Sequence, residues 1–586
     1  MQGLFYQVSI PDPARRQFRI ALTIKKFSPG TPLELELPAW TPGSYLIREY
    51  AGSVVTLGAV QDGRKLEVRK TRKDRFSFIP DRKSPVCVTY TVNAVDSSVR
   101  KLWISREYAF ITGAAAFLRP AGLKKCRCRV AFDLPEEFDF IATAMKRISA
   151  PGDKKAVFEA KDYDELIDSP VMAGPSGSIA KAEFTAGGVP HRLSIFGCPR
   201  ADTERLAADL KKICETEIRF WSEDGVPPFP SYDFLISTAG GGWGGLEHCG
   251  SVAAAAPVAA FPFSGAEPPD KYTELLALLA HEYFHAWNVK RLKPAAFLPY
   301  DLQNETYTTL LWFFEGFTEY YEEVILYRAG LVSEKKLLER LSSFFMTVYS
   351  REGHRYQSLA ESSYDTWIKL YRPDDASANT GISYYTKGAL AAFALDLMIR
   401  NRSEGARSLD SAMRKLWPSC VKKGLSEDSR ELIAAVSYAA GVPKKEAADW
   451  IRRLFETAEP IGWKELLASE GLRLASSKRD FWRDALGARL SGDAEKCVLA
   501  SLSDTGCLAR AGLLPGDELV ALDGFRLRKS TAEDLARQIG SRAALLSYFR
   551  KERLLEAEIE LRPDAAPPKL SLQFASSARK SWPKAA

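Results

Sequence analysis

The sequence predicts a multidomain α+β protein with an antiparallel β domain, a mainly helical region and a small C-terminal module of short strands. Three observations support this prediction. A chain of 586 residues is too long for a single hydrophobic core. Apolar residues alternate in short runs before residue 177, and they recur at helical spacing between residues 271 and 470. Hydrophobic residues make up 46% of the chain and charged residues 26%, as in an ordinary globular protein.

Short apolar runs separated by Pro and Gly characterise the first part of the chain. The runs FRIALTIKKF, PLELELPAW and CVTYTVNAV alternate apolar and polar residues, which is the period of a strand with one buried face. Because such strands follow one another closely along the chain, we expect them to pair in antiparallel sheets.

Helical periodicity begins near Ala201, where apolar residues recur every three or four positions in RLAADLKKICETEIRFW. Further helices are predicted from TELLALLAHEYFHAWNV, TTLLWFFEGFTEYYEEVILYR and YYTKGALAAFALDLMIR. Residues 486–561 return to short strands and turns with one helix, AEDLARQIG, and this change predicts a separate small domain.

Composition excludes several classes of protein. The longest apolar stretch, Ser251–Phe263, is interrupted by Pro257 and Pro262, so we expect no membrane span. The start of the sequence lacks the pattern of a signal peptide, and the nine cysteines follow no disulfide framework, which favours a cytoplasmic location. The net charge of +7 is spread along the chain, and no nucleic-acid partner is expected.

Two of the five histidines form the strongest motif in the chain. His281 and His285 stand four residues apart in a helical pattern, with Glu282 directly after the first. This spacing places both imidazoles on one helix face, one turn apart, which suits two ligands of a zinc ion. Glu282 then lies beside the metal, where it can take a proton from water.

A third ligand is predicted downstream in LWFFEGFTEYY. Glu315 is a carboxylate flanked by aromatic residues, and a buried carboxylate without a partner is costly, so a cation is its natural neighbour. Glu319, one turn later, is the second candidate. The alternative to a metal site is that His281 and His285 are partly buried residues of an ordinary helix and that Glu315 is a surface glutamate.

These motifs resemble those of a known peptidase family. HEYFHAWNVKRLKP followed by LWFFEGFTEYY resembles the gluzincins, thermolysin-like zinc peptidases that take a glutamate ligand from a second helix. Tyr384-Tyr385-Thr386-Lys387-Gly388 is similar to a motif of the gluzincin aminopeptidases. The resemblance implies that Tyr385 donates a hydrogen bond to the developing oxyanion, with Tyr384 as the adjacent alternative.

A glycine-rich loop resembles that of one branch of the gluzincins. Gly244-Gly245-Leu246-Glu247-His248 is similar to the substrate loop of the glycyl aminopeptidases, gluzincins with an attached PDZ domain. LPAWTPGSYLIREY and LIDSPVMAG also resemble their β domain. The resemblance implies that Glu247 binds the α-ammonium group of the substrate and that the pocket prefers Gly or Ala. Glycines at 244 and 245 would let the backbone approach an extended peptide.

The C-terminal module resembles a PDZ domain. Ala485-Leu486-Gly487-Ala488 precedes ARAGLLPGDELVALDG, and a glycine-bearing loop of this kind points backbone N–H groups at a peptide carboxylate. The module therefore either binds a peptide ligand or packs as a stabilising part of the enzyme.

Together the motifs predict an aminopeptidase with one Zn²⁺ per chain that releases small N-terminal residues from peptides with a free N-terminus. A gluzincin endopeptidase and a non-catalytic PDZ scaffold with a vestigial metal site are the alternatives. The expected divisions are a β domain (1–177), a thermolysin-like catalytic domain (178–395), a helical domain (396–477), a PDZ domain (478–565) and a disordered tail (566–586).

Overall fold

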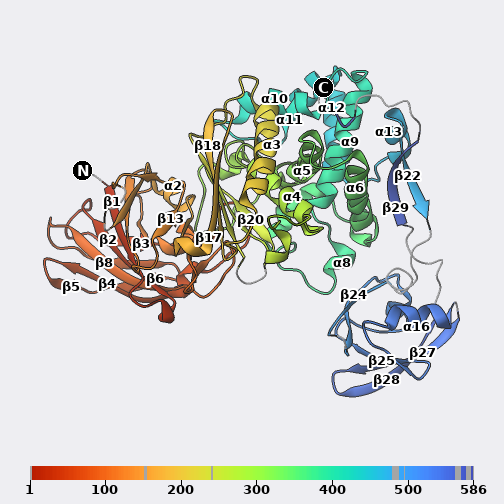
Figure 1. Ribbon diagram of the computed structural model, residues 1–586, viewed down its shortest axis with the longest axis horizontal. Helices are drawn as coiled ribbons and strands as arrows, with labels where there is room; N and C mark the ends of the chain where they lie inside the picture. The colour runs from red at the N-terminus through yellow and green to blue at the C-terminus, as the bar shows by residue number, and fades with distance from the viewer. Residues whose placement is uncertain are drawn as a thin grey trace. The chain divides into compact units, whose positions relative to one another are not determined.

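The computed structural model describes residues 3–150, 153, 155–238, 242–477, 487–493, 495–540, 542–560, 569–575 and 582–584 (Figure 1). The chain divides into two compact units. The first comprises Met1–Thr306, Ile325–Val332 and Leu416–Ser426, and the second comprises Tyr307–Val324, Ser333–Lys415 and Glu427–Ala586. None of the helices in the described ranges is long and apolar enough to cross a lipid bilayer.

The N-terminal β domain consists of one large sheet and two small ones. Phe18, Ile20 and Leu22 of β2 have no exposed surface, as the alternating pattern predicts. The large sheet has the order β14 (Lys146–Arg147), β15 (Ala156–Ala160), β12 (Arg127–Asp133), β1 (Gly3–Ser9), β2 (Gln17–Ile24), β8 (Val86–Asn93), β4 (Val54–Gln61) and β5 (Arg64–Leu66). The small sheets have the orders β13 (Phe140–Ala142), β16 (Val171–Gly174), β10 (Ala109–Ile111), β9 (Leu102–Ile104) and β11 (Arg119–Pro120), β3 (Leu33–Glu36), β7 (Arg75–Phe78), β6 (Arg69–Arg72).

One pair of strands departs from the antiparallel prediction. β1 and β12 run parallel, whereas the other neighbours in the large sheet are antiparallel. No hairpin joins β1 to β12, so the direction of β12 is set by packing rather than by a turn. Two short helices, α1 (Gly113–Ala116) and α2 (Tyr163–Ile167), lie in the same domain.

A five-stranded sheet follows in the first unit. Its order is β17 (Ile179–Ala186), β18 (Val189–Phe196), β19 (Tyr232–Ser237), β21 (Ser251–Ala255) and β20 (Gly244–Glu247). Helix α3 (Thr203–Trp221) packs on β17, and α4 (Lys271–Phe284) packs on β20 and β21 (Figure 1). Since β20 ends the order of this sheet, one edge of the strand pairs with β21 and the other edge faces away from the sheet.

The chain between residues 271 and 470 is mainly helical, as predicted, but residues 286–310 form turns and loops with one short 3-10 turn at Ala295–Phe297. A π-helical turn at Trp312–Gly316 leads into α5, and the long predicted helix at this place is therefore divided. The helices that follow are α5 (Phe317–Arg328), α6 (Glu334–Tyr349), α7 (Leu359–Tyr364), α8 (Ser377–Thr380), α9 (Thr386–Arg402), α10 (Leu409–Cys420), α11 (Arg430–Ala440), α12 (Lys444–Ile451) and α13 (Trp463–Ser469).

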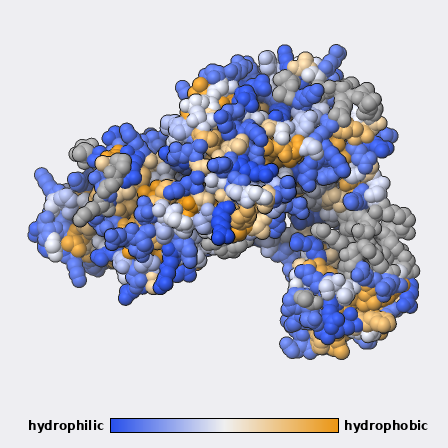
Figure 2. Space-filling view, in the orientation of Figure 1, coloured by the Kyte–Doolittle hydropathy of each residue, from blue (hydrophilic) through white to orange (hydrophobic). Residues whose placement is uncertain are grey.

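The small C-terminal module has its own hydrophobic core, which includes Leu499, Leu508 and Leu546. Phe525 and Leu554 of this module are exposed. Figure 2 shows hydrophobic and hydrophilic residues mixed on the face of the module that is in view. Its elements are β23 (Ala488–Ser491), β24 (Cys497–Leu502), α15 (Cys507–Arg510), β25 (Glu518–Leu522), β26 (Phe525–Arg526), α16 (Ala532–Ile539), β27 (Ala543–Arg550) and β28 (Arg553–Glu560), and the sheet order is β23-β24-β25-β27-β28 with β26 paired to β25.

The prediction of a disordered tail after residue 566 is wrong for two segments. Lys569–Phe574 forms β29, which pairs antiparallel with β22 (Leu472–Ser477), and Trp582 is buried. The alternating residues of KLSLQF place Leu572 in the interior, which composition alone did not indicate. The remaining tail residues, together with Ala485 and Leu486 of the predicted PDZ loop, lie outside the described residues.

Candidate metal centre and substrate site

Helix α4 carries the predicted zinc motif at its C-terminal end. His281 lies in the last turn and His285 is the C-cap, whose backbone N–H donates to the carbonyl of His281. Their ring centroids are 4.6 Å apart. His285 Nδ1 lies 2.8 Å from the carbonyl oxygen of Asn288, so this nitrogen carries the proton and Nε2 is the atom that could bind a metal.

The predicted third ligand joins these histidines. Ligand atoms of His281, His285 and Glu315 lie within 4.8 Å of one another, and all three residues are buried. Glu315 belongs to the π-helical turn, a rare local structure that occurs mostly at functional sites. A second, less buried grouping contains His281 with Glu319 and Glu322. We favour the first because two imidazoles and one carboxylate form the usual catalytic zinc set.

Glu282 lies against the glycine-rich strand β20. A Cβ atom built on Gly245 would lie 2.2 Å from Glu282 Oε1 and 2.6 Å from its Cγ, so any side chain at this position collides with the carboxylate. Glu282 is only 5% exposed. Only glycine at position 245 therefore allows strand β20 to contact the Glu282 carboxylate.

Glu247, two residues along the same strand, meets the N-terminal β domain. A Cβ atom on Gly43 would lie 2.4 Å from one carboxylate oxygen of Glu247 and 2.5 Å from the other. Gly43 also has a φ of +92°, which favours glycine. Arg100 Nη2 donates to the carbonyl oxygen of Gly245 at 2.9 Å. The β domain thus supplies two contacts to the glycine-rich segment Gly244–Glu247.

A buried charge cluster that sequence analysis missed lies next to Glu247. Lys290 Nζ is 2.6 Å from Asp168 Oδ1, and His248 Nδ1 is 3.3 Å from the same oxygen. The backbone N–H of Cys249 donates to the other oxygen at 2.8 Å. Burial raises the pKa of Asp168, but the Lys290 ammonium and the His248 hydrogen bond outweigh it and hold the pKa well below its usual range.

Lys290 shows the reciprocal effect. Burial lowers the pKa of Lys290, but the carboxylate of Asp168 has a larger, opposite effect and Glu247 adds to it. The net result is a pKa above the usual range of lysine. Asp168 lies in LIDSPVMAG and Lys290 in HEYFHAWNVKRLKP, both of which carried the family resemblance. Those motifs were the only sequence signal for this cluster.

Glu217 of α3 is a second residue that sequence analysis missed. It has no exposed surface, and its carboxylate oxygens accept no hydrogen bond from the described residues. Burial raises its pKa well above the usual range, and His281 partly offsets this effect. Its position in an amphipathic helix gave no indication that it would lie near a zinc ligand.

The two candidate tyrosines have different surroundings. Tyr384 is fully buried, its hydroxyl lies 3.1 Å from Thr366 Oγ1, and burial raises its pKa well above the usual range, with Tyr371 and Glu315 adding to the rise. Tyr385 is half-buried at the N-cap of α9, with its hydroxyl 3.1 Å from that of Tyr371. Tyr385 is therefore the more accessible of the two residues.

Comparison with known proteins identifies the family. The Peptidase M61 N-terminal domain matches residues 5–175, and the M61 glycyl aminopeptidase domain matches residues 274–391. An aminopeptidase N family protein from Idiomarina loihiensis has a crystal structure that is 31% identical, with a TM-score of 0.91 and 98% coverage of each chain. No curated protein sequence matches the chain.

Two further solved structures match the chain at lower similarity. Yeast LTA4 hydrolase is 14% identical with a TM-score of 0.48, covering 78% of this chain and 68% of its own. An M1 zinc metallopeptidase from Deinococcus radiodurans is 13% identical with a TM-score of 0.47, covering 79% and 96%. The 31% identity over nearly the full length, the two matched domains and the buried His281, His285 and Glu315 group show that this chain belongs to the M61 glycyl aminopeptidase family and is a metallo-aminopeptidase.

Proposed function

We propose that the protein is a zinc aminopeptidase that releases small N-terminal residues, preferably Gly and Ala, from unblocked peptides, with one zinc ion per chain. The proposal depends above all on the buried group of His281, His285 and Glu315, whose ligand atoms lie within 4.8 Å of one another. Two imidazoles and one carboxylate fit a catalytic zinc ion, which keeps a fourth position open.

The bound zinc ion would polarise the scissile carbonyl and lower the pKa of water. Glu282 then acts as the general base that takes the proton of the attacking water and returns it to the leaving amine. Its position against Gly245 supports this role, because the strand holds the carboxylate in one place. Tyr385 donates a hydrogen bond to the oxyanion, and its half-buried hydroxyl suits contact with a substrate better than the buried hydroxyl of Tyr384.

Glu247 provides the selection for a free amine. It is 4% exposed, and its Oε1 accepts no hydrogen bond from the described residues, so a substrate ammonium would supply the missing partner. The peptide would lie as an added strand beside Gly244 and Gly245, whose strand β20 ends the sheet order. Nearby Lys290 is paired with Asp168, which keeps its charge from competing for Glu247.

The first test compares free and N-acetylated peptides of the same sequence. We expect chelator-sensitive release of the first residue from the free peptides and no cleavage of the acetylated ones. Internal cleavage of both at similar rates would instead identify an endopeptidase.

The second test uses Glu282→Gln, which keeps the size of the side chain but cannot accept a proton. We expect metal analysis to find one zinc per chain in this variant and turnover to fall by a factor of about 100 to 10,000. Retained zinc with unchanged turnover would refute the role of Glu282. No hydrolysis of any free-amine peptide by the zinc-loaded wild type would favour the scaffold alternative.

We further propose that the C-terminal module is a PDZ domain that binds a peptide C-terminus. Its strand β23 ends the sheet order, and Gly487 immediately precedes it with a φ of +64°. A fluorescence-anisotropy screen should find C-terminal peptides that lose binding when their carboxylate is amidated. Equal binding of amidated peptides, or none of either kind, would favour a packing role.

A further inference from the structure

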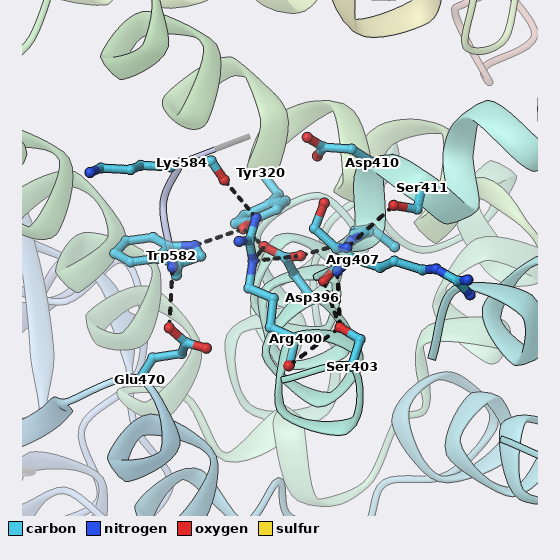
Figure 3. Close-up of polar contacts among 12 residues, drawn as sticks. Tyr320, Asp396, Arg400, Ser403, Arg407, Asp410, Ser411, Glu470, Trp582 and Lys584 are labelled. Atoms are coloured by element: carbon cyan, nitrogen blue, oxygen red, sulfur yellow. Dashed lines mark hydrogen bonds and ion pairs between the residues drawn. The ribbon is translucent and has the colours of Figure 1, made fainter. Parts of the chain in front are cut away.

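The C-terminal residues Trp582–Lys584 bind into the helical region of the second unit. Trp582 is 4% exposed. Its indole N–H donates to the Tyr320 hydroxyl at 3.0 Å, and its backbone N–H donates to Glu470 Oε2 at 3.1 Å (Figure 3). The ring centroid lies 5.2 Å from that of Phe393. The segment therefore occupies a site with both polar and aromatic partners.

A buried ion pair forms the other half of this site. Arg400 is 1% exposed, its Nε lies 3.1 Å from both oxygens of Asp396, and its Nη2 donates to the carbonyl oxygen of Lys584 at 2.9 Å. The Tyr320 hydroxyl donates to Asp396 Oδ2 at 2.8 Å. The hydrogen bonds thus form a closed circuit from Trp582 through Tyr320, Asp396 and Arg400 back to the chain at Lys584 (Figure 3).

This circuit joins the two helices that follow the metal and tyrosine motifs. Tyr320 lies on α5, five residues after Glu315, and both Asp396 and Arg400 lie on α9, whose N-cap is Tyr385. The two segments also meet at a second place, because a Cβ atom on Gly316, four residues before Tyr320, would lie 2.6 Å from the Cα of Gly388, eight residues before Asp396. The glycine contact and the circuit fix α5 and α9 at two separate points.

We propose that Trp582–Lys584 is a positioning element of the active site, which holds α5 and α9 in the arrangement that presents Glu315 and Tyr385. Removing Trp582 takes away the donor to Tyr320 and opens the Asp396–Arg400 pair to water, since a buried ion pair depends on complete hydrogen bonding. The helices then keep the glycine contact, the Tyr320–Asp396 hydrogen bond and the ring contact between Tyr320 and Phe393, but these lose the cover of the indole, and small shifts of Glu315 weaken metal binding.

The test uses full-length variants with two readouts at 25 °C. The first readout is the dissociation constant for zinc in competition with a chelator, and the second is kcat and KM on glycine 4-nitroanilide. Trp582→Ala should raise the zinc dissociation constant about tenfold and lower kcat with little change in KM, equivalent to about 1.4 kcal/mol. Trp582→Phe keeps the aromatic contact but loses the N–H, and it should show a smaller change.

Lys584→Ala is the matched control. Lys584 is exposed and accepts the Arg400 hydrogen bond through its backbone carbonyl, which the alanine variant keeps, so both readouts should match the wild type. Tyr320→Phe breaks the circuit at the hydroxyl that joins Trp582 to Asp396 while the sequence of the tail stays unchanged, and it should reproduce the direction of the Trp582→Ala effect even if that variant folds poorly. Unchanged zinc affinity in Tyr320→Phe would count against the proposal.

A complementation experiment separates positioning from mere stability. A chain ending at residue 581 should recover zinc affinity and kcat when the peptide RKSWPKAA is added, but not when its Trp is replaced by Ala. A lower melting temperature with wild-type zinc affinity and kcat would overturn the proposal and leave a purely structural anchor. The zinc readout does not depend on the proposed role of Glu247, so failure of amine selection is distinguishable from failure of this inference.

Discussion

Replacing Gly245 by Ala should remove most activity without unfolding the protein. The new Cβ atom would lie 2.2 Å from Glu282 Oε1, whereas ordinary contacts begin at 3.4 Å, so the carboxylate must withdraw by about 1 Å. A displacement of this size at a catalytic group costs a factor of about 100 in rate, or about 2.7 kcal/mol. The melting temperature should fall modestly as well, because Glu282 Cγ would lie 2.6 Å from the new Cβ and the buried side chain must move from near its base.

The assay is kcat on glycine 4-nitroanilide, with zinc content and melting temperature measured on the same preparation. Gly242→Ala is the matched control, because it lies in the same glycine-rich segment and its new Cβ would meet Ala255 Cβ at an ordinary 3.9 Å. We expect the control to retain wild-type kcat. If Gly245→Ala also keeps kcat within twofold of the wild type while binding zinc, the assignment of Glu282 as the base beside β20 is refuted.

Three further predictions follow from the surrounding contacts. Gly43→Ala should raise KM for free-amine substrates about tenfold, because its Cβ would displace the Glu247 carboxylate. The control is Gly30→Ala, which has a similar φ and open space around it and should leave KM unchanged. Asp168→Asn should lower the free energy of unfolding in urea by about 3 kcal/mol by leaving buried Lys290 without its partner; a loss below about 1 kcal/mol would contradict the buried pair. Folding depresses the pKa of Asp168, so the free energy that its carboxylate contributes to folding is complete above its ordinary pKa of about 3.9 and is lost as the pH falls toward the lower folded pKa. The free energy of unfolding of Asp168→Asn should therefore fall less steeply with decreasing pH than that of the wild type. Dialysis against a chelator should abolish activity, with zinc restoring it; activity that survives complete metal removal would exclude the proposed metal centre.

Local patterns in the sequence predicted the metal centre. His281 and His285 share a face of α4 because the helical period alone puts residues four apart on one side. The aromatic neighbours of Glu315 indicated its burial, and the structure places it with both histidines. The π-helical turn that carries Glu315 was not predicted, because the residues around it are nearly all apolar and a one-residue shift of the helical period leaves no mark in such a segment.

The sequence by itself determined the metal-binding helix, the alternating strands and the family motifs, since these depend on residues within one or two turns of each other. Only the tertiary structure decided which distant residues meet. Arg100 and Gly245 are 145 residues apart and Trp582 and Tyr320 are 262 apart, and no local period encodes either contact. The tail is the clearest case. Its composition predicts disorder, but Trp582 occupies a buried hydrogen-bonding site that α5 and α9 form together in the folded chain.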